Sequence, residues 1–266
     1  MSQVILQNKI QKDYSTFKAI IDDTLTEVTA DMLVGIREIS SYAFYTCANL
    51  TSVEIPTSVS YIRDYAFASC NVLQNISLTN GLVFIGQNAF YNAGNMIQPK
   101  PQNFNVIIPN SVTSIGQSAF SYSRINSINL SNQITEIKDF TFNGCPSLTS
   151  INIPNNIITI GNNVFTSSKL SNVIIGNGVT SIGNTCFAGC DSLTSVTIQA
   201  ISPPTLGSSV FAGTSQNLVI YVPSESVETY KSASGWSTYA SRIQPIPSWH
   251  LRFLWYNDSV TWWRVH

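Results

Sequence analysis

The chain has 266 residues, of which only 10% are charged, and its formal net charge is −1. Ser, Asn and Thr number 36, 25 and 23, so uncharged polar groups replace much of the roughly 25% charge of an average soluble domain. So few cations cannot neutralise many phosphates, which argues against a nucleic-acid partner. No apolar run approaches the roughly 18–20 residues of a membrane-spanning helix, so we expect no membrane insertion.

The first 24 residues predict a helix. Ile10, Tyr14, Phe17, Ile21 and Leu25 recur every three or four positions, which is helical spacing. We expect residues 1–24 to cap the open end of the structure that follows. A short coiled coil, which would make the chain oligomeric, is the alternative, because the spacing is near-heptad. The segment lacks the basic leader, long apolar run and cleavage site of a signal peptide.

An internal repeat begins after this segment. Phenylalanine recurs at intervals of 22 to 24 residues, with one interval of 30, and each phenylalanine follows an aliphatic residue by five positions. The phenylalanines are Phe44, Phe67, Phe90, Phe120, Phe142, Phe165, Phe187 and Phe211, and the aliphatic residues are Ile39, Ile62, Ile85, Ile115, Ile137, Ile160, Ile182 and Leu206.

A second block of the repeat reads Leu50-Thr51-Ser52-Val53-Glu54-Ile55-Pro56, and similar blocks start at Leu148 and Leu193. Apolar and polar residues alternate in it, which predicts a strand that ends at the proline. A unit this short cannot bury its own apolar face, whereas stacked units can. Residues 25–222 therefore predict a solenoid of one degenerate and about eight repeats. We expect a parallel β-sheet on one face and short helical or irregular turns on the other.

One repeat is longer than the others. The interval between Phe90 and Phe120 exceeds the usual period by seven residues, and the extra residues fall at 94–104. Insertions in solenoids form protruding loops that often contact partners. A tolerated loop without function is an equal alternative.

The C-terminal part of the chain predicts a second helical cap at residues 223–246. Ser224 is a suitable N-cap, Gly235 a suitable end, and Trp236 and Tyr239 can fold back onto the last turn. The remaining residues, 247–266, are tryptophan-rich and fit a β-hairpin. Their Trp249, Trp255, Trp262 and Trp263 are candidate contacts for a partner; alternatively the tail packs on the solenoid or belongs to a domain outside it.

The repeat also explains the residues that could suggest chemistry. Cys47, Cys70, Cys145 and Cys190 each follow a repeat phenylalanine by three positions, where other turns have Ala, Ser or Thr. We therefore interpret these cysteines as small buried residues, and we expect them neither to form disulfides nor to bind a metal. His250 and His266 lie near the C-terminus, and no nucleophile–base or phosphate-binding motif occurs. From the sequence we therefore expect a protein that is not an enzyme and that binds neither a metal nor a cofactor.

The outward side of the predicted strands is the candidate binding surface. Its polar, nearly uncharged side chains suit hydrogen bonding to a glycan or an extended peptide, although Ser, Asn and Thr are also merely tolerated on a solvated sheet. Two columns of residues define it, with Asn217 and Val219 as their last members and no aromatic residue in either. The candidate contacts are Ser52, Glu54, Asn75, Ser77, Ser127, Asn129, Ser150, Asn152, Asn172, Ser195 and Thr197.

The repeated unit Ile-Gly-x-x-Ala-Phe…Cys-x-x-Leu-Thr-Ser-Val-x-Ile-Pro resembles the BspA-like leucine-rich repeat over about residues 36–222. This resemblance implies a leucine-rich-repeat solenoid, a location at a bacterial or protist cell surface, and a role in adhesion and partner binding. It implies no reaction. Residues 25–30 and the helix before them also resemble, more weakly, the start of some prophage members of the family.

These observations predict a non-enzymatic binding or adhesion module that recognises a protein or glycan at a cell or particle surface through the solenoid face. The alternative is a structural or receptor-binding component of a phage or prophage particle, assembled through its ends.

Overall fold

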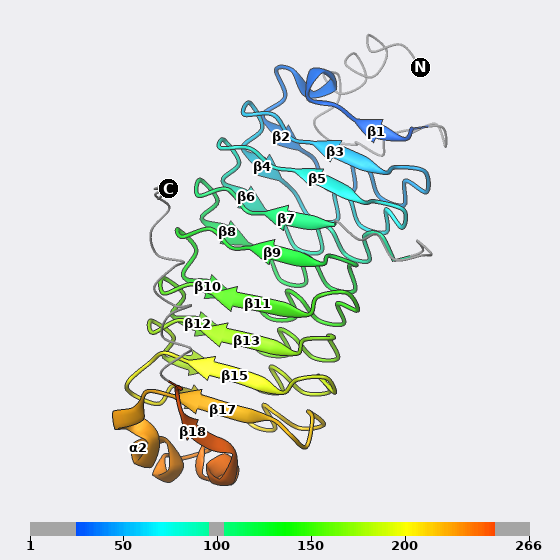
Figure 1. Ribbon diagram of the computed structural model, residues 1–266. Coiled ribbons are helices and arrows are strands. Elements are labelled where there is room, and N and C mark those ends of the chain that lie inside the picture. The colour runs from blue at the N-terminus through cyan, green and yellow to red at the C-terminus, as the bar shows by residue number, and fades with distance from the viewer. Residues whose placement is uncertain (1–24, 96–103, 248–266) are drawn as a thin grey trace, which may run out of the picture.

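The computed structural model describes residues 25–95 and 104–247, which wind into a stack of about nine parallel turns (Figure 1). Most turns contribute one strand of three or four residues to a front sheet and a two-residue strand to a second sheet. The predicted solenoid with a parallel sheet along one face is therefore confirmed. The helix proposed for residues 1–24 lies outside the described residues.

The front sheet is built from the alternating blocks of the repeat. Its strands pair in parallel and in register within three hydrogen-bonded groups, β1-β3-β5, β7-β9 and β11-β13-β15-β17-β18. In order they are β1 (Glu27–Val28), β3 (Ser52–Glu54), β5 (Asn75–Ser77), β7 (Asn105–Ile107), β9 (Ser127–Asn129), β11 (Ser150–Ile153), β13 (Asn172–Ile175), β15 (Ser195–Ile198), β17 (Val219–Val222) and β18 (Ile243–Pro245).

The second sheet was not predicted. Each of its strands has two residues, too few to show an alternating pattern, and the second is the aliphatic residue that precedes phenylalanine by five. They form two groups, β2-β4-β6-β8 and β10-β12-β14-β16. The strands are β2 (Glu38–Ile39), β4 (Tyr61–Ile62), β6 (Phe84–Ile85), β8 (Ser114–Ile115), β10 (Glu136–Ile137), β12 (Thr159–Ile160), β14 (Ser181–Ile182) and β16 (Thr205–Leu206).

The repeat phenylalanines form the wall opposite the front sheet. All eight rings are buried and stack in one column, with centroids of neighbouring rings 4.9 to 5.8 Å apart. Together with the inward aliphatic residues they make one core cluster that extends from Val28 to Ile243. The phenylalanine is the largest side chain buried in each turn, so it contributes more to stability than any other single side chain of the repeat.

Of the helical or irregular turns that we expected, the backbone of this phenylalanine wall has the irregular kind, joined from turn to turn by a ladder of hydrogen bonds. The residues two before and two after each repeat phenylalanine have positive φ, for example Tyr42 (62°) and Thr46 (60°) around Phe44. In the first turn these three residues donate their N–H groups to carbonyl oxygens of the next turn, at 3.1, 2.9 and 2.7 Å for Tyr42, Thr46 and Phe44. Backbone hydrogen bonds between turns thus replace those within a helix.

The C-terminal segment differs in detail from the predicted helix of residues 224–235. A 3-10 helix, η2 (Ser224–Ser226), precedes a short α-helix, α2 (Val227–Ser232), and a second 3-10 helix, η3 (Ser237–Arg242), leads into β18. Ser224 donates to its neighbour Glu225 and caps no helix. Tyr230 and Trp236 from this segment are buried against the last turns.

The insertion after Phe90 lies almost wholly in residues 96–103, outside the described residues, and the front sheet is interrupted between β5 and β7 at this point. At the N-terminal end, the 3-10 helix η1 (Ala30–Leu33) connects β1 to the second sheet. No helix in the described ranges is long and apolar enough to cross a membrane.

Candidate functional site

The predicted contacts occupy the outward positions of the front sheet. In the first column Ser52 lies opposite Asn75, and Ser150, Asn172 and Ser195 follow one another in register on three strands. In the second column Glu54 lies opposite Ser77, and Ile107 lies opposite Asn129. Because the strands are parallel and in register, these side chains form straight rows along the stack, with Ile107 66% exposed.

Most polar side chains on this sheet face are available to a partner. Within the described part of the chain, the side chains of Asn129, Ser150 and Asn152 make no hydrogen bond. The same holds for Ser52, Asn75, Ser77 and Ser195. Side-chain bonds do occur elsewhere on the face: Ser127 Oγ donates to Asn105 Oδ1 at 2.7 Å, Asn172 Nδ2 donates to Ser171 Oγ at 3.0 Å, and Glu54 Oε2 accepts from Ala30 N at 3.5 Å.

Polar residues beside the strands have a different use. Hydroxyl groups there donate to carbonyl oxygens of the preceding turn, as from Thr51 Oγ1 to Thr26 at 2.9 Å. Asparagine and aspartate side chains accept from backbone N–H groups of the following turn, as Asp64 does from Gln87 and Asn162 does from Asn184, both at 2.8 Å. These side chains satisfy backbone groups at the edges of the sheets, where sheet pairing ends.

Two expectations about the face are wrong. Thr197 is 1% exposed because it is a short side chain between Ile174 and Tyr221, which face it on the neighbouring strands. In the last turn Ser195 pairs with Val219, not Asn217, so the register is shifted by two residues from the predicted one. The shift places Tyr221 in the second column, which therefore does contain an aromatic residue.

The five cysteines are all buried free thiols. The slot three residues after phenylalanine holds a small side chain, which is Ala93 in one turn and carries a donor group in most others. Cys70 and Cys190 donate to phenylalanine carbonyls of the preceding turn at 3.1 and 3.0 Å, and Ser168 does the same at 2.7 Å. Burial raises the pKa of the Cys145 and Cys190 thiols to about 12. Such thiols are poor nucleophiles and poor metal ligands at neutral pH.

Residues suited to metal binding or catalysis are sparse where the structure is described. In these ranges no group of three or more His, Cys, Asp or Glu side chains comes together. Both histidines, and the candidate contacts Trp249, Trp255, Trp262 and Trp263, lie outside the described residues.

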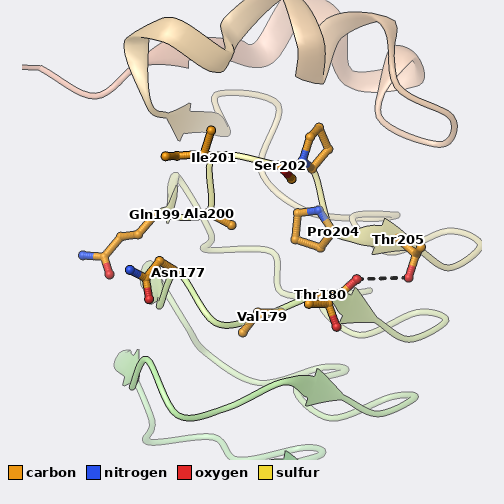
Figure 2. Close-up of a pocket in the computed structure, with 10 residues that line it drawn as sticks. Asn177, Val179, Thr180, Gln199, Ala200, Ile201, Ser202, Pro204 and Thr205 are labelled. Carbon is orange, nitrogen blue, oxygen red and sulfur yellow. Dashed lines mark hydrogen bonds between the residues drawn. The ribbon is translucent and has the colours of Figure 1, made fainter.

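An open pocket of about 410 Å³ lies beyond the C-terminal ends of β13 and β15 (Figure 2). Asn177 and Gln199 lie on one side of it, and Pro204 and Thr205 on the other. The pocket arises where the connection from β15 to β16 is one residue longer than the connection from β13 to β14. The interval of 24 between Phe187 and Phe211 was the sequence signal for this extra length.

Sequence reasoning also missed an aromatic surface outside the sheet face. Tyr42 and Tyr45 are 48% and 47% exposed on the phenylalanine wall, and the Tyr42 ring stacks on that of Tyr65 at 4.9 Å. The Arg63 guanidinium lies 4.8 Å from the Tyr61 ring centroid and binds Glu38 at 2.7 Å, which raises the pKa of Arg63. These contacts among neighbouring turns are a structural use of the aromatic residues.

Comparison with known proteins identifies the fold independently. The family model described as "BspA type Leucine rich repeat region" matches residues 37–104 and 100–219, in six copies. No curated protein matches the chain.

Among solved structures, a leucine-rich repeat protein from Bacteroides ovatus is 26% identical, with a TM-score of 0.55 over 74% of this chain and 54% of that one. The chain thus spans about half of that protein. A leucine rich repeat protein from T. pallidum is 27% identical, with a TM-score of 0.45 over 66% and 69% of the two chains. A leucine rich cell surface protein from Faecalibacterium prausnitzii is 20% identical, with a TM-score of 0.35 over 86% and 81%.

The family model covers well over half of the chain, and its two matched ranges together include all eight phenylalanines of the column. The chain belongs to the BspA type leucine rich repeat family.

Proposed function

We propose that this chain is a non-enzymatic binding module that recognises a protein at a cell or particle surface through the front sheet. Membership of a leucine-rich-repeat family supports a role in protein interaction at a surface. The proposal goes further by naming the sheet face and by excluding a reaction. A glycan ligand has weaker support, because Tyr221 is the only aromatic residue among the two columns of the described face.

One observation carries the proposal. Seven polar side chains on the sheet face make no hydrogen bond in the described part of the chain, whereas equivalent residue types beside the strands bond to neighbouring turns. Donors and acceptors fixed on rigid strands at a regular spacing can bind a partner without first breaking internal bonds. The near absence of charge on this face favours an uncharged partner surface.

The proposal can be tested with an array of extracellular-matrix proteins, bacterial surface proteins and glycans, probed with the full chain. We expect saturable binding to at least one protein. Ser150→Arg, at the centre of the face, should weaken that binding at least tenfold, because an arginine blocks close approach. Ser209→Arg, at an exposed position on the phenylalanine wall, should leave it unchanged. Binding to no protein on the array, or equal loss in both variants, would contradict the proposal.

A further inference from the structure

The pocket beside β13 and β15 is a built feature of the fold. Its rim is the connection Gln199–Pro204, which contains Pro203 and Pro204 and is held from the outside by two buried side chains. Tyr230 Oη donates to the Ala200 carbonyl at 2.8 Å, and Trp236 Nε1 donates to the Pro204 carbonyl at 2.7 Å. Two prolines and two hydrogen bonds fix this connection before any ligand arrives, which lowers the entropic cost of binding.

The lining of the pocket has a distinct chemistry. All ten lining residues are uncharged. The apolar part includes Val179, Pro204 and Ile201, whose side chain is 66% exposed. Within the described residues the side-chain amides of Asn177 and Gln199 have no hydrogen-bond partner, and both lie on the same side of the pocket (Figure 2). An amide offers one acceptor and two donors, the complement of a peptide backbone.

The pocket also adjoins the apolar end of the sheet face. Gln199 follows Thr197 by two residues, and Thr197 lies between Ile174 and Tyr221 on the neighbouring strands. A ligand that enters the pocket can therefore continue onto a surface with an aliphatic and an aromatic side chain. Tyrosine at such a position is typical of the residues that contribute most to binding energy at protein interfaces.

We propose that this pocket binds an extended, uncharged segment of a partner protein. An apolar side chain of the segment occupies the space between Ile201 and Pro204, and its backbone groups bond to the amides of Asn177 and Gln199. The proposal rests on the proposed function and adds to it the position and the chemistry of the contact. The neutrality of every lining residue argues against an acidic or basic peptide, because a charged group would lose its hydration with no opposite charge to replace it.

The experiment uses a random dodecapeptide phage library panned on the immobilised full chain. Selected peptides are synthesised and titrated calorimetrically against the wild type and variants whose folding is checked by circular dichroism. We expect uncharged peptides with a shared apolar residue, bound at least tenfold more weakly by Ile201→Asp and several-fold more weakly by Gln199→Ala. The matched control is Val34→Asp, at an equally exposed aliphatic residue at the other end of the solenoid, and it should bind normally.

Selection of charged peptides, or peptides that bind Ile201→Asp as well as the wild type, would overturn the proposal. A chain truncated after Pro247 tests another occupant: if the full chain selects no peptide and the truncated chain does, residues 248–266 occupy the pocket and the proposal of a partner segment fails. A protein found on the array separates the two proposals. If Ser150→Arg abolishes its binding and Ile201→Asp does not, the proposed function holds and the pocket proposal fails.

Discussion

The sheet face and the phenylalanine wall come from the same repeat but use their residues in opposite ways. On the wall, ring stacking, positive φ and donor groups of buried Cys and Ser fix nearly every position. On the face, inward residues are apolar, while the side chains of outward residues such as Asn129 and Asn152 make no hydrogen bond within the described residues. Stability therefore comes from the wall, the edges and the inward side chains of the sheet, and the outward side chains contribute little to it.

The largest expected effect is the loss of one ring from the wall. Phe120→Ala removes a fully buried side chain that stacks at 5.3 and 5.8 Å on the rings before and after it. We expect the free energy of unfolding to fall by about 3–5 kcal/mol, as for other buried phenylalanines. Urea denaturation measures the change. The matched control is Asn129→Ala, which lies in the next front-sheet strand with its side chain on the face. A similar loss of stability in both variants would contradict the difference between wall and face.

A smaller loss is expected from the buried donor slot. Ser168 Oγ donates to the Phe142 carbonyl at 2.7 Å and accepts from Cys145 N at 3.1 Å. Ser168→Ala leaves both backbone groups without that partner and should cost about 1–3 kcal/mol. Ser168→Cys should restore part of the loss, because cysteine occupies this slot in four other turns. If Ser168→Ala and Ser168→Cys were equally stable by urea denaturation, the donor role would be wrong.

The buried thiols predict how stability depends on pH. Burial raises the pKa of Cys145 from 9.0 to about 12, so the folded chain keeps a proton that the unfolded chain loses. This contribution is complete below pH 9 and is lost as pH rises from 9 to 12, by about 1 kcal/mol between pH 9 and pH 10. Thermal unfolding of the wild type and Cys145→Ser across this range measures it. A Cys145→Ser variant with an unchanged pH slope would contradict the assignment.

Relief of backbone strain should have a still smaller effect, with the opposite sign. Thr46 has a φ of 60°, which a β-branched residue rarely adopts, and the same position is Gly144, Gly189 and Gly213 in later turns. We expect Thr46→Gly to stabilise the chain by about 0.5–1 kcal/mol. The matched variant Thr51→Gly, in a half-buried edge position with a hydrogen bond to Thr26, should destabilise it. Differential scanning calorimetry distinguishes the two signs.

The smallest effect is expected on the face. Asn152→Ala removes an exposed side chain that makes no hydrogen bond with the described residues. Its free energy of unfolding should stay within about 0.5 kcal/mol of the wild type. A urea midpoint that moved well beyond this range would show that the face contributes to the stability of the turns.

The repeat could be predicted from the sequence because stacking forces the same side chain into the same place in every turn. Phe44 to Phe211 and the aliphatic residues before them therefore mark the turns without any alignment. The outward columns followed from the alternation of Val53, Glu54 and Ile55. The two-residue strands of the second sheet could not be predicted in this way, because a strand with a single aliphatic residue shows no alternation of apolar and polar residues.

The details of the last turns were not predictable for a different reason. The register of β17 depends on the extra residue in the connection after β15, and no local pattern shows on which side of the strand that residue lies. The burial of Thr197 depends in turn on this register, since it brings Tyr221 beside it. The pocket has the same origin, and the donor role of the cysteine slot required the positions of the neighbouring carbonyls.

The most direct test of the division between face and wall is a variant with Asn75, Asn129, Ser150, Asn152 and Ser195 all changed to alanine. Its melting temperature and its affinity for a protein found on the array are measured on the same sample. We predict a melting temperature within about 4 °C of the wild type, together with loss of at least nine-tenths of the binding. A large fall in melting temperature, or binding that survives all five changes, would contradict the account.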